Sequence, residues 1–278
     1  MDADTAAHTD RGIGRFARIT RSPMGWMLVG ILGIGAVSAL TQGGHPVLAI
    51  VGAVASVAVY RLVMRHLARR ATPEIAPRRA VSHTVIGVVL GVVMITASVL
   101  MVFTEFSFAP VSGDVMAIVA GMVVVQLWAA VTEELIFRGL LLQALERWCG
   151  SAIALAITAV LFGLLHLANP GATLWSSFAI AVEAGVLLGA AFLWRRNIWL
   201  VVGLHFAWNT CVALLGIPVS GHENAGVLDT QPIGPDLLTG GDFGIEASIA
   251  PIAVSLLLAV PMLIAARKRG NLVPWRRR

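Results

Sequence analysis

Charged residues are scarce in this sequence. They make up 13% of its 278 residues, whereas hydrophobic residues make up 58% and the mean hydropathy is +0.84. A soluble domain carries about a quarter charged residues, so this composition excludes an ordinary aqueous fold. Apolar segments run almost continuously over residues 24–266, which indicates a single membrane domain.

The sequence also lacks several signatures of catalysis and binding. Its two cysteines, Cys149 and Cys211, form no CxxC motif and are interpreted as reduced structural thiols. Neither GxSxG nor HExxH occurs, so a serine hydrolase or a zincin-type metal site is not indicated. The net charge is +5, but the arginines form short clusters at the ends of apolar segments, without interleaved aromatic residues. This pattern is typical of membrane topology and not of nucleic-acid binding.

We predict an all-α integral membrane protein with about eight transmembrane helices, because a spanning helix needs about 20 apolar residues. The predicted helices cover residues 24–40, 47–64, 81–103, 115–137, 152–167, 174–194, 198–215 and 247–266. The chain then divides into three parts: a cytoplasmic segment at 1–23, the membrane domain at 24–266 and a cytoplasmic basic tail at 267–278.

The placement of positive charge predicts the orientation. With the N-terminus inside, eight crossings leave five segments in the cytoplasm, and these segments hold all 20 lysines and arginines: 1–23, 61–80, 138–151, 195–197 and 267–278. The loops expected outside hold none, as the positive-inside rule requires. We therefore expect a multi-pass protein of a bacterial cell membrane, with both termini cytoplasmic.

Two adjacent glutamates lie in the fourth predicted helix. Glu134 and Arg138 are four residues apart, so they share a helix face and can form an ion pair. Glu133 lies about 100° around the helix and has no cation within that helix. A charge at the bilayer centre costs about 2.5–3.5 kcal/mol on insertion scales, which favours a functional role for Glu133. The alternative is structural: both acids pair with Arg138 and hold helices together.

A lone histidine, His166, lies in the fifth predicted helix. By itself it is most simply a packing residue. However, Glu133 and His166 are equally far from the turn expected near Cys149 and Gly150. In an antiparallel helix hairpin such residues lie at the same depth, so we expect Glu133 and His166 to meet.

The seventh predicted helix carries His205 and Asn209, four residues apart on one face. Taken alone they predict an interhelical hydrogen-bond pair. Together with Glu133 and His166 they predict one polar cavity between helices four, five and seven. A further acid, Glu183, lies in the sixth helix, where we expect a buried structural hydrogen bond.

This set of residues has a chemical interpretation. A carboxylate beside an imidazole in a dry cavity is a general-base arrangement that can activate water. A histidine with an asparagine can donate hydrogen bonds to a tetrahedral oxyanion. The reaction class that uses both parts is the hydrolysis of an acyl bond, most naturally a peptide bond.

Three motifs occur in order on successive predicted helices: EExxxR, FxxxH and HxxxN, with Gly185-x-x-x-Gly189 between the last two. This order resembles the CPBP family, which comprises the type II CAAX prenyl endopeptidases and their bacterial Abi relatives, intramembrane proteases. The resemblance covers residues 121–211. We interpret Gly185 and Gly189 as a site of close helix packing.

The resemblance implies a role for each matching residue. Glu133 would be the catalytic glutamate, and His166 would position or activate the water with it. His205 and Asn209 would form the oxyanion site. Three further residues would support the site: Glu134 and Arg138 by bracing the fourth helix, and Phe162 by packing.

We expect a glutamate-dependent mechanism that needs no cofactor. The alternative is a divalent metal such as zinc, held by Glu133, His166 and His205. The expected partners are a membrane-associated protein or peptide substrate and the lipid bilayer. Two other functions stay open: a non-catalytic immunity or scaffold protein of the same fold, and a transporter, although no internal repeat is found.

Overall fold

The computed structural model describes residues 15–43, 45–111 and 114–275. Residues 1–14 of the predicted N-terminal segment and residues 276–278 of the basic tail lie outside this part of the chain. The helices are α2 (Arg15–Arg21), α3 (Pro23–Thr41), α4 (Pro46–His66), α5 (Ala80–Met101), α6 (Val115–Glu134), α7 (Leu142–Leu165), α8 (Leu174–Ile180), α9 (Leu187–Arg195), α10 (Ile198–Leu214), α11 (Asp236–Thr239) and α12 (Ile249–Lys268). Two strands, β1 (Phe106–Pro110) and β2 (Leu228–Pro232), form a two-stranded antiparallel sheet with Phe106 opposite Pro232.

Two π-helical segments interrupt the regular helices. One, Leu135–Leu141, joins α6 to α7, and the other, Ala181–Val186, joins α8 to α9. A π-helix widens the backbone hydrogen-bonding pattern and is frequent at functional sites. Both segments begin at or near a membrane-embedded acid, Glu134 in the first case and Glu183 in the second.

Several of the long helices begin at a capping side chain. The Ser22 hydroxyl accepts a hydrogen bond from the Gly25 amide at 3.0 Å, and the Asn197 side chain accepts one from the Leu200 amide at 3.1 Å. Such caps satisfy amides that the first helical turn leaves unpaired. They fix the starts of α3 and α10.

The architecture confirms an all-α integral membrane protein. Six helices in the described part of the chain are long and apolar enough to span a bilayer. The fourth and fifth predicted helices belong to one apolar helical run, Val115–Ala168, and the seventh has 17 residues, which is shorter than the others. The predicted count of eight is therefore not confirmed.

The chain reverses direction inside α7, at Gly150. This residue has φ 76° and ψ 168°, a conformation that is open essentially only to glycine. Phe137 and Phe162, which are equidistant from this point, stack edge to face with ring centroids 4.8 Å apart. The turn expected between the fourth and fifth helices is thus present, and the two arms run antiparallel.

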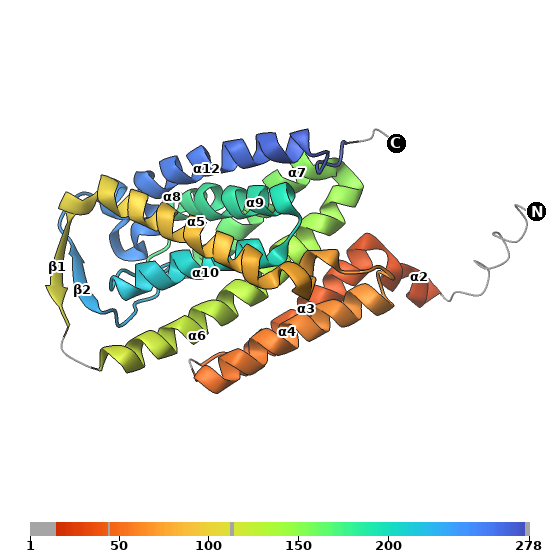
Figure 1. The fold of residues 1–278 in the computed structure, drawn as a ribbon, viewed down its shortest axis with the longest axis horizontal. Helices are drawn as coiled ribbons and strands as arrows, with labels where there is room; N and C mark the ends of the chain where they lie inside the picture. Colours follow the sequence, from red (N-terminus) through yellow and green to blue (C-terminus); the bar gives the residue numbers. More distant parts are fainter. Residues whose placement is uncertain (1–14, 44, 112–113, 276–278) are drawn as a thin grey trace, which may run out of the picture.

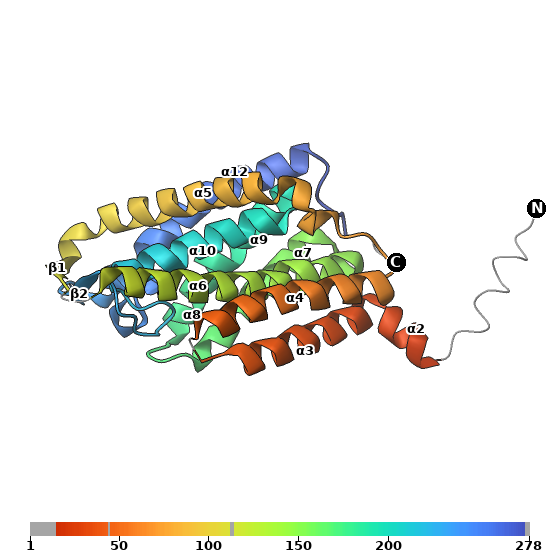
Figure 2. The ribbon, with the colours of Figure 1, turned by 60° about the horizontal axis from the view of Figure 1, so that its bottom comes forward.

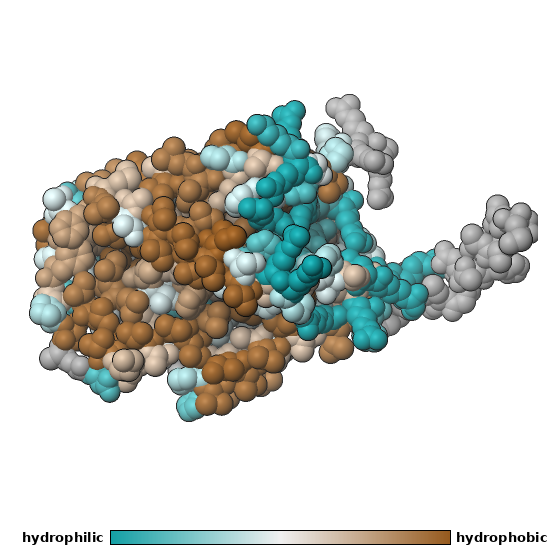
Figure 3. Space-filling view, viewed as in Figure 1, coloured by the Kyte–Doolittle hydropathy of each residue, from teal (hydrophilic) through white to brown (hydrophobic). Residues whose placement is uncertain are grey.

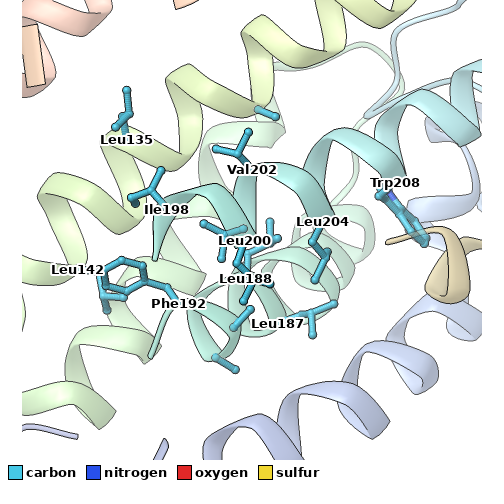
Figure 4. Close-up of a cluster of buried hydrophobic side chains, with 14 of the residues drawn as sticks. Leu135, Leu142, Leu187, Leu188, Phe192, Ile198, Leu200, Val202, Leu204 and Trp208 are labelled. Carbon is cyan, nitrogen blue, oxygen red and sulfur yellow. The ribbon is translucent and has the colours of Figure 1, made fainter. Parts of the chain in front are cut away.

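Helix α10 lies at the centre of the bundle. It packs along α5 and α6 and against α9, while α12 covers α9 and α4 packs on α3 and α6. A helix that is apolar on all sides is expected to be buried, and most of α10 is. Figure 4 shows Leu200, Leu204 and Trp208 of α10 in one cluster with Leu188 and Phe192. The bundle is elongated, with its helices roughly along one axis (Figure 2).

The surface of the molecule is divided into an apolar belt and a polar end. Figure 3 shows hydrophobic residues over most of the visible face, and hydrophilic residues gathered at the end that carries α2 and the C-terminus. Exposed side chains of the belt include Leu32, Val81 and Leu257, each at least 72% exposed. Such an apolar surface fits a bilayer and not water. The β1–β2 sheet lies at the opposite end (Figure 1).

We predict that Gly150→Ala destabilises the protein by about 1–3 kcal/mol, the usual cost of a strained backbone conformation. The new Cβ would also approach the Trp275 amide to 2.7 Å. Thermal unfolding in detergent measures the effect. The control is Gly121→Ala in α6, where a Cβ meets no atom within 4 Å and helix propensity should improve. A Gly150→Ala protein as stable as the control would contradict this account of the reversal.

We also predict that the polar, arginine-rich end faces the cytoplasm. Topology reporters fused after Ile75, between α4 and α5, and after Thr230, in β2, should report opposite sides of the membrane, with Ile75 inside. Reporters found on the same side would disprove the predicted topology.

Candidate functional site

A buried ionic network joins three helical segments. Glu134 at the end of α6 is fully buried. Its Oε1 accepts a hydrogen bond from the Arg138 guanidinium at 2.9 Å and lies 2.8 Å from Nδ1 of His205 on α10. The predicted Glu134–Arg138 pair is therefore present. The link to His205 was not predicted, because no sequence spacing relates residues 71 positions apart.

Arg138 extends this network to the second π-helical segment. Its Nη2 donates to the carbonyls of Ala184 at 3.1 Å and Gly185 at 3.2 Å. The guanidinium also lies over the Phe162 ring, 4.9 Å from its centroid, which is a favourable cation–π geometry. One side chain thereby links α6, α7 and the α8–α9 segment. Gly185 lies against Ala159 of α7, which agrees with its predicted role in close helix packing.

Phe162 is a packing residue, as its motif position implies. It is 2% exposed and contacts Phe137, His166 and His205, with ring centroids 4.8, 4.7 and 6.4 Å away. Its carbonyl lies 2.7 Å from Nδ1 of His166. Because a carbonyl can only accept, Nδ1 must carry the proton, which leaves Nε2 of a neutral His166 as an acceptor.

A cavity of about 460 Å³ opens beside α6. Its lining includes Glu133, His166 and Asn209, three of the four residues predicted to be catalytic. No described residue donates a hydrogen bond to the Glu133 carboxylate, and no direct bond joins it to His166. The expected meeting of Glu133 with His166 is thus a shared cavity and not a direct contact.

Gln126 is a polar residue of this cavity that the sequence analysis missed. Its Oε1 accepts a hydrogen bond from Nδ2 of Asn209 at 3.3 Å. Gln126 lies seven residues before Glu133 on the same face of α6. A polar side chain at this spacing in an apolar helix was a signal that could have identified it.

A second, smaller cavity shares His166, Asn209 and Ser220 with the larger one. It has a volume of about 20 Å³, and its lining also includes His205, Glu183 and Glu246. This volume is enough for about one water molecule. The hydrogen bond expected for Glu183 is not found: neither carboxylate oxygen has a partner among the described residues. For Glu183 the predicted burial is confirmed, but the predicted hydrogen bond is not.

Glu246, just before α12, was also missed. Its carboxylate accepts hydrogen bonds from Nε1 of Trp208 at 3.1 Å and from the Ser220 amide. Burial raises the pKa of Glu246, while these hydrogen bonds and the nearby His166 act in the opposite direction. Glu246 holds the loop after α10 against the helix bundle. Its position in a loop gave no periodic signal from which the sequence could predict it.

The possible metal ligands do not converge. Within residues 15–43, 45–111 and 114–275, no group of three or more His, Cys, Asp or Glu side chains is arranged to hold a metal ion. Glu133 lines only the larger cavity, and His205 lines only the smaller one and binds Glu134, while His166 lines both. This donor set does not fit a metal site, and we derive no step through a metal.

Comparison with known families agrees with the motifs. Residues 115–211 match the family model described as type II CAAX prenyl endopeptidase Rce1-like. The match spans about a third of the chain and contains every residue of the EExxxR, FxxxH and HxxxN motifs. It confirms the resemblance over this segment. No curated protein and no solved structure gives a significant match.

We predict that Arg138→Ala destabilises the folded protein by about 3–5 kcal/mol, because removing one partner leaves the other charge buried and unpaired. Thermal unfolding and monodispersity in detergent provide the measurement. Arg65→Ala, which removes an exposed arginine of α4, is the control and should stay within about 0.5 kcal/mol of the wild type. Equal stability of the two variants would show that the network contributes little.

Proposed function

We propose, on the premise that residues 115–211 form a domain of the CAAX prenyl endopeptidase type, that this protein is an intramembrane endopeptidase. At the family level the match supports a CAAX-protease-type peptidase of the membrane. The observation that carries the finer proposal is the Glu133 carboxylate, which accepts no hydrogen bond from the described residues and faces a cavity shared with His166 and Asn209. The proposed reaction is hydrolysis of a peptide bond in a membrane-associated protein or peptide.

Glu133 acts as the general base. It takes a proton from a water molecule while the water oxygen attacks the carbonyl carbon of the scissile bond. The proton then passes from Glu133 to the departing nitrogen, the C–N bond breaks, and a carboxylic acid and an amine are released. A base within hydrogen-bond reach of its water typically accelerates such a step 10²–10⁴-fold.

His166 orients the water. Its Nδ1 donates to the Phe162 carbonyl, which fixes the ring and leaves Nε2 to accept a hydrogen bond from the water. The Phe162 ring packs on the imidazole. This support holds the acceptor in one place while Glu133 removes the second proton of the same water.

His205 and Asn209 stabilise the oxyanion. Nδ1 of His205 is held by Glu134, whose carboxylate balances the charge of an imidazolium that donates from Nε2. Asn209 uses one N–H to bind Gln126 and has a second N–H for the substrate oxygen. Donors fixed before the reaction stabilise the negative charge without the cost of reorganisation.

We predict that Glu133→Gln reduces peptide hydrolysis to near background, whereas Asn209→Ala loses about 100- to 1,000-fold in turnover, the usual effect of removing one oxyanion donor. The assay uses purified protein in lipid with a library of membrane-spanning peptides, and mass spectrometry detects the products, with and without a chelator. Glu133→Gln should unfold at the wild-type temperature because its carboxylate accepts no hydrogen bond.

The control for Glu133→Gln is Arg65→Gln, which neutralises an exposed side chain of α4 and should leave hydrolysis unchanged. Hydrolysis that survives in Glu133→Gln would end the proposed mechanism. A biological effect of the protein that persists in Glu133→Gln would favour a non-catalytic immunity or scaffold role. Activity that a chelator removes and added metal restores would replace the protein-only mechanism.

A further inference from the structure

The larger cavity beside Glu133 extends toward one end of the bundle. Four of its lining residues belong to the loop that follows α10: Val219, Ser220, His222 and Asn224. A fifth, Asn169, lies in the loop between α7 and α8, and its Nδ2 donates to the Ser220 carbonyl at 3.0 Å. The loop after α10 leads directly into β2, so the mouth of the cavity lies at the end that carries the β1–β2 sheet (Figure 1).

The connecting segments at this end of the bundle are poor in positive charge. The connecting segments 102–114, 166–173 and 215–248 contain neither Lys nor Arg. Figure 3 shows the largest hydrophilic area at the opposite end. By the positive-inside rule, the end whose connecting segments lack Lys and Arg faces away from the cytoplasm.

The floor of the cavity is closed toward the basic end. Phe137 lines the cavity and is only 7% exposed. Beyond it lie the Glu134–Arg138–His205 network and the fully buried side chains of Leu135 and Leu140. A chain segment entering from the arginine-rich end would have to break this ionic network, whereas the loop side is open.

The charge around the mouth selects among substrates. Five exposed acids lie in the connecting segments of this end: Asp114, Glu223, Asp229, Asp236 and Asp242. No Lys or Arg of these segments offsets them, and Glu223 lies between two cavity residues, His222 and Asn224. A surface of one sign attracts partners of the opposite sign and repels those of the same sign.

We infer that substrates reach the Glu133 cavity from the extracytoplasmic face, and that they are peptide segments exposed there that carry cationic rather than acidic side chains. The inference rests on the proposed peptidase function for its chemistry. The side of access and the preference for cations can be measured without any cleavage.

Thiol labelling tests the side of access. In a background of Cys149→Ser and Cys211→Ser, one cysteine is placed in the cavity wall, Ala129→Cys, one at the rim, Asn224→Cys, and one at the basic end, Arg65→Cys. Membrane-impermeant methanethiosulfonates are applied to intact cells and to inside-out vesicles. We expect Ala129→Cys and Asn224→Cys to react in intact cells and Arg65→Cys only in inside-out vesicles.

The charge preference is read from the same variant. At Ala129→Cys a cationic methanethiosulfonate should react at least about 10-fold faster than an anionic one, as expected for steering by a charged surface. Glu223→Gln should reduce this ratio and leave the reaction rate of a neutral reagent unchanged. Equal rates, or a faster anionic reagent, would overturn the cationic preference.

If Ala129→Cys reacted only in inside-out vesicles, the inference of access from the extracytoplasmic face would be wrong. Reaction from neither side, with Asn224→Cys reactive, would overturn it as well, because the cavity would then be closed at its mouth. Labelling needs no proteolysis. A negative labelling result therefore tests only the route into the cavity. Hydrolysis that is retained in Glu133→Gln tests the proposed peptidase chemistry instead.

Discussion

The structure depends on one carboxylate oxygen, Oε1 of Glu134, which is shared by Arg138 and His205. A buried carboxylate inside a bilayer is costly unless it is paired and hydrogen-bonded. Here the pairing crosses between α6 and α10, and Arg138 continues it to the backbone carbonyls of Ala184 and Gly185. The same contacts that stabilise these charges also fix the relative positions of the helices that carry the cavity. Glu133 can stay free of hydrogen bonds because its neighbour performs this structural task.

The sequence predicted the parts of this arrangement that follow from local periodicity. Glu134 and Arg138 share a helix face, so their pairing could be read from a spacing of four. The equal distance of Glu133 and His166 from the turn predicted that they lie at the same depth. The contact between Phe137 and Phe162 shows that the two antiparallel arms are aligned with this register. The all-α membrane fold followed from the composition together with the length of the apolar segments.

Other features depend on tertiary contacts that no spacing encodes. His205 binds Glu134 across two helices, and Glu246 reaches Trp208 and Ser220 from a loop. Glu183 has no partner among the described residues, although a buried acid normally predicts one. The predicted number of spanning helices is not confirmed, because the fourth and fifth predicted helices form one apolar helical run and the seventh has only 17 residues.

Helix α10 is short, and this has a consequence for the loop behind it. Its 17 residues extend about 25 Å at 1.5 Å per residue, less than the roughly 30 Å of the hydrocarbon layer. The following loop must therefore begin at a depth where backbone groups find no water and need partners within the protein. The loop meets this requirement through bonds of Val227 to Leu214, Gly221 to Phe243 and Val219 to His222. The length of α10 and the fold of this loop are thus coupled, so evolution can lengthen one only by rebuilding the other.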